Sequence, residues 1–110
     1  LIDIPRMLEK DLSMLDRALK AFMDRDVEAA RAVAAEDDDV DALYDQINNE
    51  LFAFMLQDPR TVRQATRLLW VAHNLERFAD RITNICERVV FTVTGEMREM
   101  NIQEPEVEPQ

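Results

Sequence analysis

Two pairs of acidic residues with four-residue spacing are the strongest candidates for chemistry in this chain. They are Asp37 with Asp41, and Glu76 with Asp80. Each pair lies in a stretch with helical periodicity, so its two carboxylates share one helix face and repel each other by roughly a few tenths of a kcal/mol. A cation bound between the carboxylates would offset that repulsion. The pairs therefore predict a cation site.

The two pairs also match in their distance from Asp58, where the chain is predicted to turn. Asp41 precedes Asp58 by almost the same length of chain as that by which Glu76 follows it, with a difference of a single position. The same holds for Asp37 before the turn and Asp80 after it. In two antiparallel helices joined at this turn, the four carboxylates would lie at one level and face each other. Such oxygen-rich sites suit Mg²⁺, Mn²⁺, Ca²⁺ and iron, whereas zinc and copper prefer more nitrogen or sulfur.

Other polar residues near the two pairs have simpler interpretations. Glu36, Asp38 and Asp39 are assigned to a solvated face of the second helix. His73 begins the same helical stripe as Glu76 and is interpreted as a polar flanking residue, because a lone histidine outside a Glu-x-x-His pattern does not indicate a ferritin-like di-iron site. The sequence has no nucleophile–base pairing and no glycine-rich phosphate loop, so nothing in it indicates catalysis.

The composition of the 110-residue chain restricts its class further. Its 13 basic and 23 acidic residues give a net charge of −10, which disfavours binding to nucleic acid or to an anionic membrane surface. The single Cys86 excludes an internal disulfide framework and a cysteine zinc cluster. No apolar run reaches the roughly 20 residues of a membrane span, and the charged residues near the start disfavour a signal peptide. We expect a reduced, cytoplasmic setting.

Three long helices are predicted to position the acidic pairs. Asp26 is a predicted N-cap of the second helix, and Asp58 with the proline after it separates the second helix from the third. Gly95, the only glycine, is a predicted C-cap of the third helix. We assign residues 1–95 to one bundle and residues 96–110, which are acidic, to a disordered tail. The predicted helices span residues 3–23, 27–56 and 60–94.

Apolar stripes at helical spacing indicate how these helices pack. Small and large residues alternate along the third helix, which suits close antiparallel packing. The predicted fold is therefore all-α, an elongated up-down-up three-helix bundle. The stripe of the first helix is Leu8, Leu12, Leu15, Leu19 and Phe22. The stripe of the second helix, apolar except at Asp37, is Ala30, Val33, Asp37, Val40, Tyr44, Ile47, Leu51 and Phe54. The stripe of the third helix is Ala65, Leu68, Ala72, Leu75, Ala79, Ile82, Cys86, Val89 and Val93.

The third helix is apolar over more than this stripe. Val71, Phe78 and Ile85 flank it on one side, and Trp70 and Phe91 lie further round. One interpretation is that the first helix covers the flank and the rest is scattered surface apolarity. We prefer a second packing partner, either another repeat or another subunit, because three helices cannot easily cover so much apolar surface.

Two segments of the chain resemble the PhoU family of phosphate-transport regulators. They are residues 37–44, with the sequence DDDVDALY, and residues 74–85, with the sequence NLERFADRITNI. The family's signature is an acidic residue, any three residues and then Asp, once on each of two helices. The two acidic pairs match both copies of the signature in order, and Asn84 matches as well. The resemblance extends over nearly the whole chain, up to about Met100.

The resemblance implies a regulatory function. PhoU-like proteins are cytoplasmic, are not known as enzymes, and restrain the phosphate-starvation response by linking a phosphate ABC transporter to a sensor histidine kinase. They usually contain two tandem three-helix bundles, and some hold multinuclear metal clusters, iron among them, on the acidic motifs. By this resemblance Asp37, Asp41, Glu76 and Asp80 are expected to bind divalent or ferric ions, with iron, manganese, magnesium and calcium as the candidates.

The resemblance also implies that part of a longer protein is at hand. This chain has one bundle, and residues 88–95 resemble the close of the second repeat. We therefore expect a C-terminal half that packs through its third helix against a second PhoU repeat or another copy of itself. The predicted function is a non-catalytic, metal-binding interaction module that regulates phosphate uptake. The alternatives are a carboxylate-bridged metal enzyme and a structural helical adaptor without metal.

Overall fold

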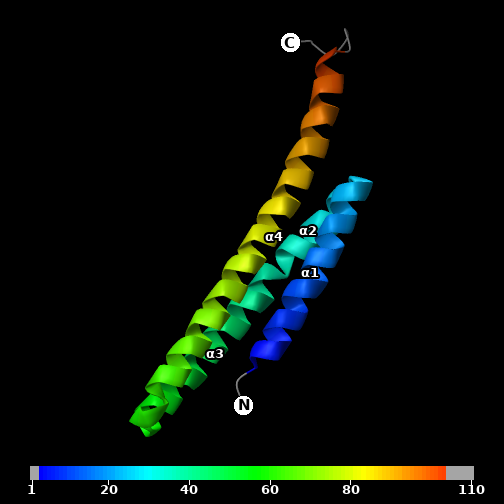
Figure 1. The fold of residues 1–110 in the computed structure, drawn as a ribbon. Coiled ribbons are helices and arrows are strands. Elements are labelled where there is room, and N and C mark those ends of the chain that lie inside the picture. The colour runs from blue at the N-terminus through cyan, green and yellow to red at the C-terminus, as the bar shows by residue number, and fades with distance from the viewer. Residues whose placement is uncertain (1–2, 104–110) are drawn as a thin grey trace.

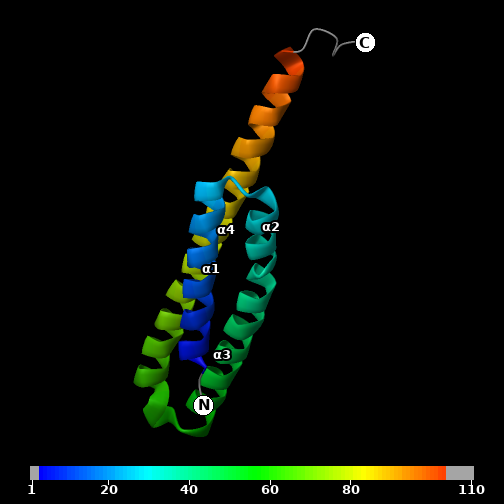
Figure 2. The same ribbon diagram turned by 90° about the vertical axis from the view of Figure 1, so that its right-hand side faces the viewer.

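The protein is a bundle of three antiparallel legs, as predicted (Figure 1). The computed structural model describes the backbone of residues 3–103 and the side chains of residues 3–95, and this part of the chain contains no strand. The first leg, residues 4–24, runs up. The second leg, residues 27–57, runs down, and the third leg, residues 62–103, runs up again (Figure 2). No helix among the described residues is long and apolar enough to cross a membrane. The elements are α1 (Ile4–Asp24), α2 (Val27–Ala35), α3 (Asp37–Gln57), a short 3₁₀ helix (Pro59–Thr61) and α4 (Val62–Gln103).

The first connection is set by backbone conformation and by a cap. Arg25 ends α1 in the left-handed conformation, with φ of 55°. Asp26 then caps α2 as predicted, because its Oδ1 accepts a hydrogen bond from the backbone N–H of Ala29 at 3.0 Å. The chain can therefore reverse within a short link, which brings α2 alongside α1.

The second leg is broken at Glu36, so the prediction of one continuous helix over residues 27–56 is wrong. The N–H of Glu36 bonds to the carbonyl of Val33, and the N–H of Asp39 bonds to the carbonyl of Glu36, each at 3.0 Å. These hydrogen bonds span three residues, as in a 3₁₀ helix, instead of the four of an α-helix, so they tighten the backbone locally. The Glu36 side chain explains the position of the break, because α1 binds it. Lys10 Nζ lies 2.6 Å from Glu36 Oε1, and Arg17 Nη2 donates to the same oxygen at 2.8 Å.

The assignment of Glu36 to a solvated face is therefore wrong as well. Its side chain is only 21% exposed, and it joins α1 to the break between α2 and α3. Hydrogen bonding from Arg17, and then from Lys10, lowers the pKa of Glu36 to about 2. Asp38 and Asp39 are exposed, as predicted, although Lys10 Nζ also lies 3.5 Å from Asp39 Oδ2.

The core lies along α4, which packs against all three other helices. The predicted stripe of α4 is confirmed: Leu68, Leu75 and Val93 are half-buried and the remaining six residues are buried. In the second leg the stripe is confirmed at most positions, but Phe54 is 47% exposed. The buried residues of the second leg are Ala30, Val33, Val40, Ile47 and Leu51.

The prediction of which face of the first helix packs inward is wrong: the buried face is the one next to the predicted leucine stripe. The leucines expected in the core lie beside it, and Leu12 is 52% exposed and Phe22 61% exposed. The face that packs inward carries smaller or more flexible side chains and one charged residue. Close approach to the alanine-rich stripe of α4 explains why small side chains occupy this face. The buried residues of α1 are Met7, Asp11, Met14, Ala18 and Ala21.

The third leg is longer than predicted. Gly95 does not cap α4, and it does not have a positive φ. The helix continues to Gln103 and extends beyond the ends of α1 and α2, so residues 96–103 are not an irregular tail (Figure 2). The rest of the predicted tail, residues 104–110, lies outside the described residues.

Candidate functional site

The four predicted site residues lie on α3 and α4, on the legs joined at Asp58. Asp58 Oδ1 accepts a hydrogen bond from the N–H of Arg60 at 3.1 Å, which caps the 3₁₀ turn and allows a tight reversal. Asp37 is the first residue of α3, and Asp41 follows one turn later. Glu76 and Asp80 are one turn apart on α4. The break at Glu36 therefore places the start of α3 at the site.

Glu76 is the carboxyl group that the arrangement perturbs most. It is half-buried, and burial is the main reason that its pKa rises to about 7. A hydrogen bond with Asp41, the negative charges of Asp80 and Asp41, and a hydrogen bond with Asp80 raise it further. Residues from both acidic pairs therefore meet at Glu76, as the spacing from the turn predicted.

Asp37 is the second perturbed carboxyl group. It is half-buried, and burial raises its pKa, followed by the negative charges of Asp41, Asp80 and Asp38. Its Oδ1 atom is buried and has no hydrogen-bond partner. A buried oxygen without a partner costs free energy, and a cation is one group that could satisfy it.

The four carboxylates fit a hard cation by chemistry, but they do not form a finished coordination shell. All their donors are oxygen, the ligand type of Mg²⁺, Mn²⁺ and Ca²⁺. Among the described residues, no three Asp, Glu, His or Cys side chains are gathered closely enough to hold a metal ion. Ion binding would therefore require side chains to rotate toward one another, and metal binding stays a prediction.

One turn from the carboxylates lies an aromatic pocket, which we call the Trp70 pocket. His73 takes the polar role expected of it: its Nδ1 lies 3.2 Å from the hydroxyl of Tyr44. The Trp70 ring meets the His73 ring edge to face, with centroids 5.9 Å apart. The sequence placed Tyr44 only in the core stripe, and nothing in its spacing indicated this polar contact. The cavity has about 370 Å³ and is lined by Tyr44, Asn48, Phe52, Thr66, Leu69, Trp70 and His73.

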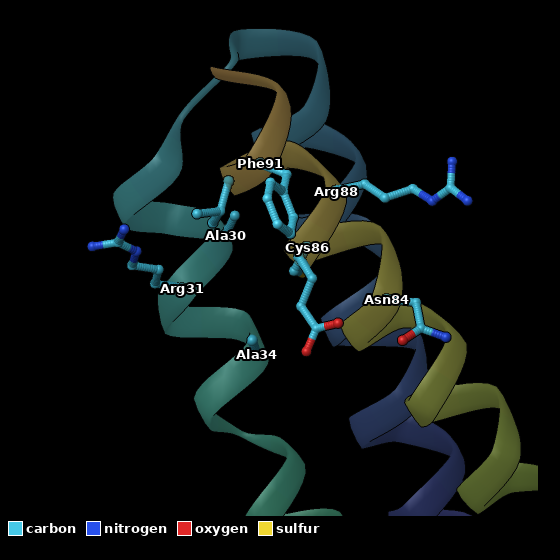
Figure 3. A pocket seen from close by; sticks show the side chains of 9 residues that line it. Ala30, Arg31, Ala34, Asn84, Cys86, Arg88 and Phe91 are labelled. Atoms are coloured by element: carbon cyan, nitrogen blue, oxygen red, sulfur yellow. The ribbon is translucent and has the colours of Figure 1, made fainter. Parts of the chain in front are cut away.

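On the other side of the carboxylates, α2 and α4 enclose a larger cavity of about 610 Å³, which we call the Phe91 pocket (Figure 3). Phe91 is 81% exposed, and its ring lies beside Ala30 in Figure 3. Cys86 is buried beneath it, which confirms its prediction as a small core residue. Arg31 and Arg88 point away from the cavity in opposite directions. The pocket is therefore apolar at its floor, and Glu87, which also lines it, adds a negative charge.

Sequence reasoning missed one further acidic residue, Asp11 on α1. Its side chain is fully buried, and neither carboxylate oxygen has a hydrogen-bond partner. Burial raises the pKa of Asp11 to about 6. The only signal in the sequence was a second stripe at helical spacing, from Met7 to Ala21, beside the more hydrophobic leucine stripe.

The fold and the site define a helical-bundle protein that carries two carboxylate pairs on adjacent, antiparallel helices. Residues 4–89 match the family model described as the PhoU domain. The chain therefore belongs to the PhoU family.

Curated relatives agree with this family. The chain is 40% identical over 99 residues to a phosphate-specific transport system accessory protein PhoU homolog of Clostridium acetobutylicum, covering 90% of this chain and 45% of the relative. It is 40% identical over 94 residues to the homolog of Deinococcus radiodurans, covering 86% of this chain and 44% of the relative. It is 42% identical over 94 residues to PhoU homolog 2 of Thermotoga maritima, covering 86% of this chain and 40% of the relative. The chain spans less than half the length of these relatives.

Proposed function

We propose that this chain is a regulatory PhoU module of phosphate uptake. It acts without catalysis, in the cytoplasm, as an interaction module between a phosphate ABC transporter and a sensor histidine kinase. Family membership supports the proposal, as do relatives whose name describes an accessory protein of phosphate-specific transport.

Metal binding by Asp37, Asp41, Glu76 and Asp80 is the chemical part of the proposal. The observation that carries it is the meeting of both acidic pairs at one level, with an unpartnered Asp37 oxygen among them. A bound divalent or ferric ion would supply positive charge there. Asp37 and Asp41 would hold it from α3, and Glu76 and Asp80 from α4. The repulsion from Asp41 and Asp80, which adds to burial in raising the pKa of Glu76, would then become shared attraction to the ion.

An ion at this position would stabilise the pairing of α3 with α4. These two helices carry the acidic pairs, so ion binding would link them across their contact and order the surface that they present. Removal of the ion would leave that surface acidic and self-repelling. The presence of the ion therefore offers the module two distinguishable surfaces for its partners.

The test is the metal content and thermal stability of the purified chain. After loading with Mn²⁺ or Fe²⁺ and dialysis, elemental analysis of the unmodified chain should find bound metal. A ligand at 100 times its Kd adds about 2.7 kcal/mol of stability, which a melting curve detects. Glu76→Gln combined with Asp80→Asn should abolish both effects while the helical circular dichroism signal is retained.

A matched control separates specific binding from loss of charge. Asp16→Asn with Asp24→Asn removes the same number of charges from exposed positions on α1 and should leave metal content unchanged. Unchanged metal content in the Glu76/Asp80 variant would reject these residues as ligands. A chain that binds no metal under any of these conditions would instead support the structural adaptor without metal.

A further inference from the structure

Three features follow one another along the same pair of legs. The Phe91 pocket comes first, the four carboxylates lie in the middle, and the Trp70 pocket comes last. We call this continuous strip the acidic face. On α4 the three parts involve residues 84–91, residues 76 and 80, and residues 66–73; on the second leg they involve residues 30–34, residues 37 and 41, and residues 44–52.

The two ends of the acidic face carry aromatic rings that are open to solvent. Phe91 is 81% exposed, Trp70 is 62% exposed and Phe52 is 51% exposed. Phe91 lines the first cavity, and Trp70 and Phe52 line the second. Large exposed aromatic residues beside a cavity mark binding surfaces more often than scattered apolar residues do.

The middle of the acidic face is negatively charged. Asp41 and Asp80 are exposed there, and Glu76 lies between them. The arginines nearest the Phe91 pocket do not neutralise this region, because Arg31 and Arg88 point away from the cavity (Figure 3). Glu87 also lines the Phe91 pocket and adds a negative charge at that end. An occupant of the whole strip must therefore carry apolar groups at both ends and positive charge in the middle and toward the Phe91 end.

We propose that the acidic face docks an amphipathic helix of a partner protein, with apolar side chains in the two pockets and arginine or lysine side chains over Asp41, Glu76 and Asp80. Trp70 and Arg88 mark the two pockets on α4. At a rise of about 1.5 Å per residue, the stretch of α4 between them covers about 27 Å, which matches about five turns of a docked helix.

A second copy of this chain is a poorer occupant. The chain carries a net charge of −10, so a second copy would bring further negative charge to the carboxylates. A basic helix meets them with opposite charge and leaves no like charges facing each other. The proposal rests on the interaction role proposed above. Because Asp41, Glu76 and Asp80 are also proposed metal ligands, a bound metal ion and the basic helix compete for them.

Trp70 provides a direct readout, because it is the only tryptophan of the chain and lines one pocket. The probe is an alanine-based peptide of about 22 residues, long enough to reach both pockets, with leucines in its end turns and arginines in its two central turns. Titration in EDTA, which removes competing metal, should give a saturable change in Trp70 fluorescence. A peptide with glutamates in place of the arginines should give none.

Variants locate the bound peptide. Phe91→Ala and Glu76→Gln leave the fluorophore, Trp70, unchanged. Phe91→Ala removes a pocket anchor and Glu76→Gln removes a central charge, so each should weaken peptide binding by about tenfold. Leu12→Ala is the matched control, because Leu12 is 52% exposed on α1 and lies outside the acidic face. This variant should bind the peptide like the unmodified chain.

Three results would overturn the proposal. They are an equal response to the glutamate peptide, equal weakening by Leu12→Ala and Phe91→Ala, and a chain dimer that Phe91→Ala dissociates and that excludes the peptide. None of these results bears on the metal-content and melting measurements described above, which are performed without peptide. Failure of this proposal and failure of metal binding are therefore distinguishable.

Discussion

Asp11 is a charged type of residue in an environment that suits an apolar side chain. A carboxylate that is fully buried without a hydrogen-bond partner is rare in folded proteins, because desolvation of the charge is costly. The protein responds by holding the proton more tightly, so the pKa of Asp11 is about 6. Asp11 is therefore a local weak point between α1 and the rest of the bundle near neutral pH.

Replacement of Asp11 by asparagine should change how stability depends on pH. The folded pKa lies above the usual value of 3.8, so the stability that the protonated form contributes is present at low pH and is lost as the pH rises through about 6. From these two pKa values the unmodified chain should lose on the order of 1 kcal/mol between pH 5 and pH 8 through this group. Asp11→Asn should remove that loss, as measured by urea unfolding at both pH values.

Glu76 also contributes to the dependence of stability on pH that this experiment measures. Its pKa of about 7 also lies above its usual value, so it contributes a loss of stability of the same sign with rising pH. Part of the slope should therefore remain in Asp11→Asn. A slope identical to that of the unmodified chain would show that Asp11 is not strained by burial.

At the scale of residues, the sequence predicted the proximity of the two acidic pairs better than the contacts around them. The four carboxylates were identified because their spacing and their distances from Asp58 are arithmetic properties of helices. Asp11 was missed because its polar side chain interrupts a stripe that is less hydrophobic than its neighbour. The contact of Tyr44 with His73 was missed because it depends on the relative rotation of two helices, which spacing within each helix does not specify.

At the scale of elements, Glu36 fixes α1 to the break in the second leg. Its carboxylate binds both Lys10 and Arg17, and its side chain is only 21% exposed. Glu36→Gln should remove the carboxylate that Lys10 and Arg17 share and destabilise the bundle by about 1 kcal/mol, at the upper end for screened ion pairs. Thermal melts at pH 7 should show this loss.

The matched control for this ion pair is at the other turn. Arg60→Gln removes the partner of Asp58, but this pair lies within one turn, joins no two helices, and Arg60 is 90% exposed. Its melting temperature should equal that of the unmodified chain. An equal effect of the two variants would mean that Glu36 does not fasten α1 to the second leg.

Gly95 offers a test of the length of α4. Because it lies inside the helix without a positive φ, and an added Cβ would meet no atom within 4 Å, alanine should fit there without strain. Gly95→Ala should therefore stabilise the chain by about 0.5–1 kcal/mol and raise its helical circular dichroism signal. Destabilisation would instead support the C-cap that the sequence predicted.

Tertiary contacts explain the element-scale errors of the sequence prediction. The number of legs and their order followed from helix formers, caps and the proline after Asp58. The break at Glu36 depends on α1, which lies far from it in the sequence. The face of α1 that packs inward is determined by the small residues of α4, so hydrophobicity within α1 alone selected the wrong stripe.

At the scale of the whole molecule, the protein is elongated. Its principal extents are 71, 27 and 16 Å, and its radius of gyration is 19.9 Å, compared with about 13 Å for a compact domain of similar length. A thin bundle leaves much apolar surface uncovered. Part of this surface is the leucine stripe of α1 that lies beside the core. Val71 of α4, which is 43% exposed, is another part.

Self-association should follow from this uncovered stripe. Sedimentation equilibrium of the chain alone should show concentration-dependent association, because removing exposed leucines from water is favourable. Leu12→Glu with Leu19→Glu should give a monomer. Leu56→Glu is the control: this residue is 86% exposed near the Asp58 turn and should leave association unchanged. An unmodified chain that stays monomeric at high concentration would contradict the prediction.

The position of α4 after the other helices in the sequence also determines when this bundle can form during synthesis. Each of α1, α2 and α3 has most of its tertiary contacts with α4, the 42-residue helix that follows all three in the sequence. At about 5–20 residues per second, synthesis of α4 takes roughly 2–8 seconds. Throughout that interval the earlier helices lack their main packing surface, so their apolar faces stay open to solvent until α4 is complete.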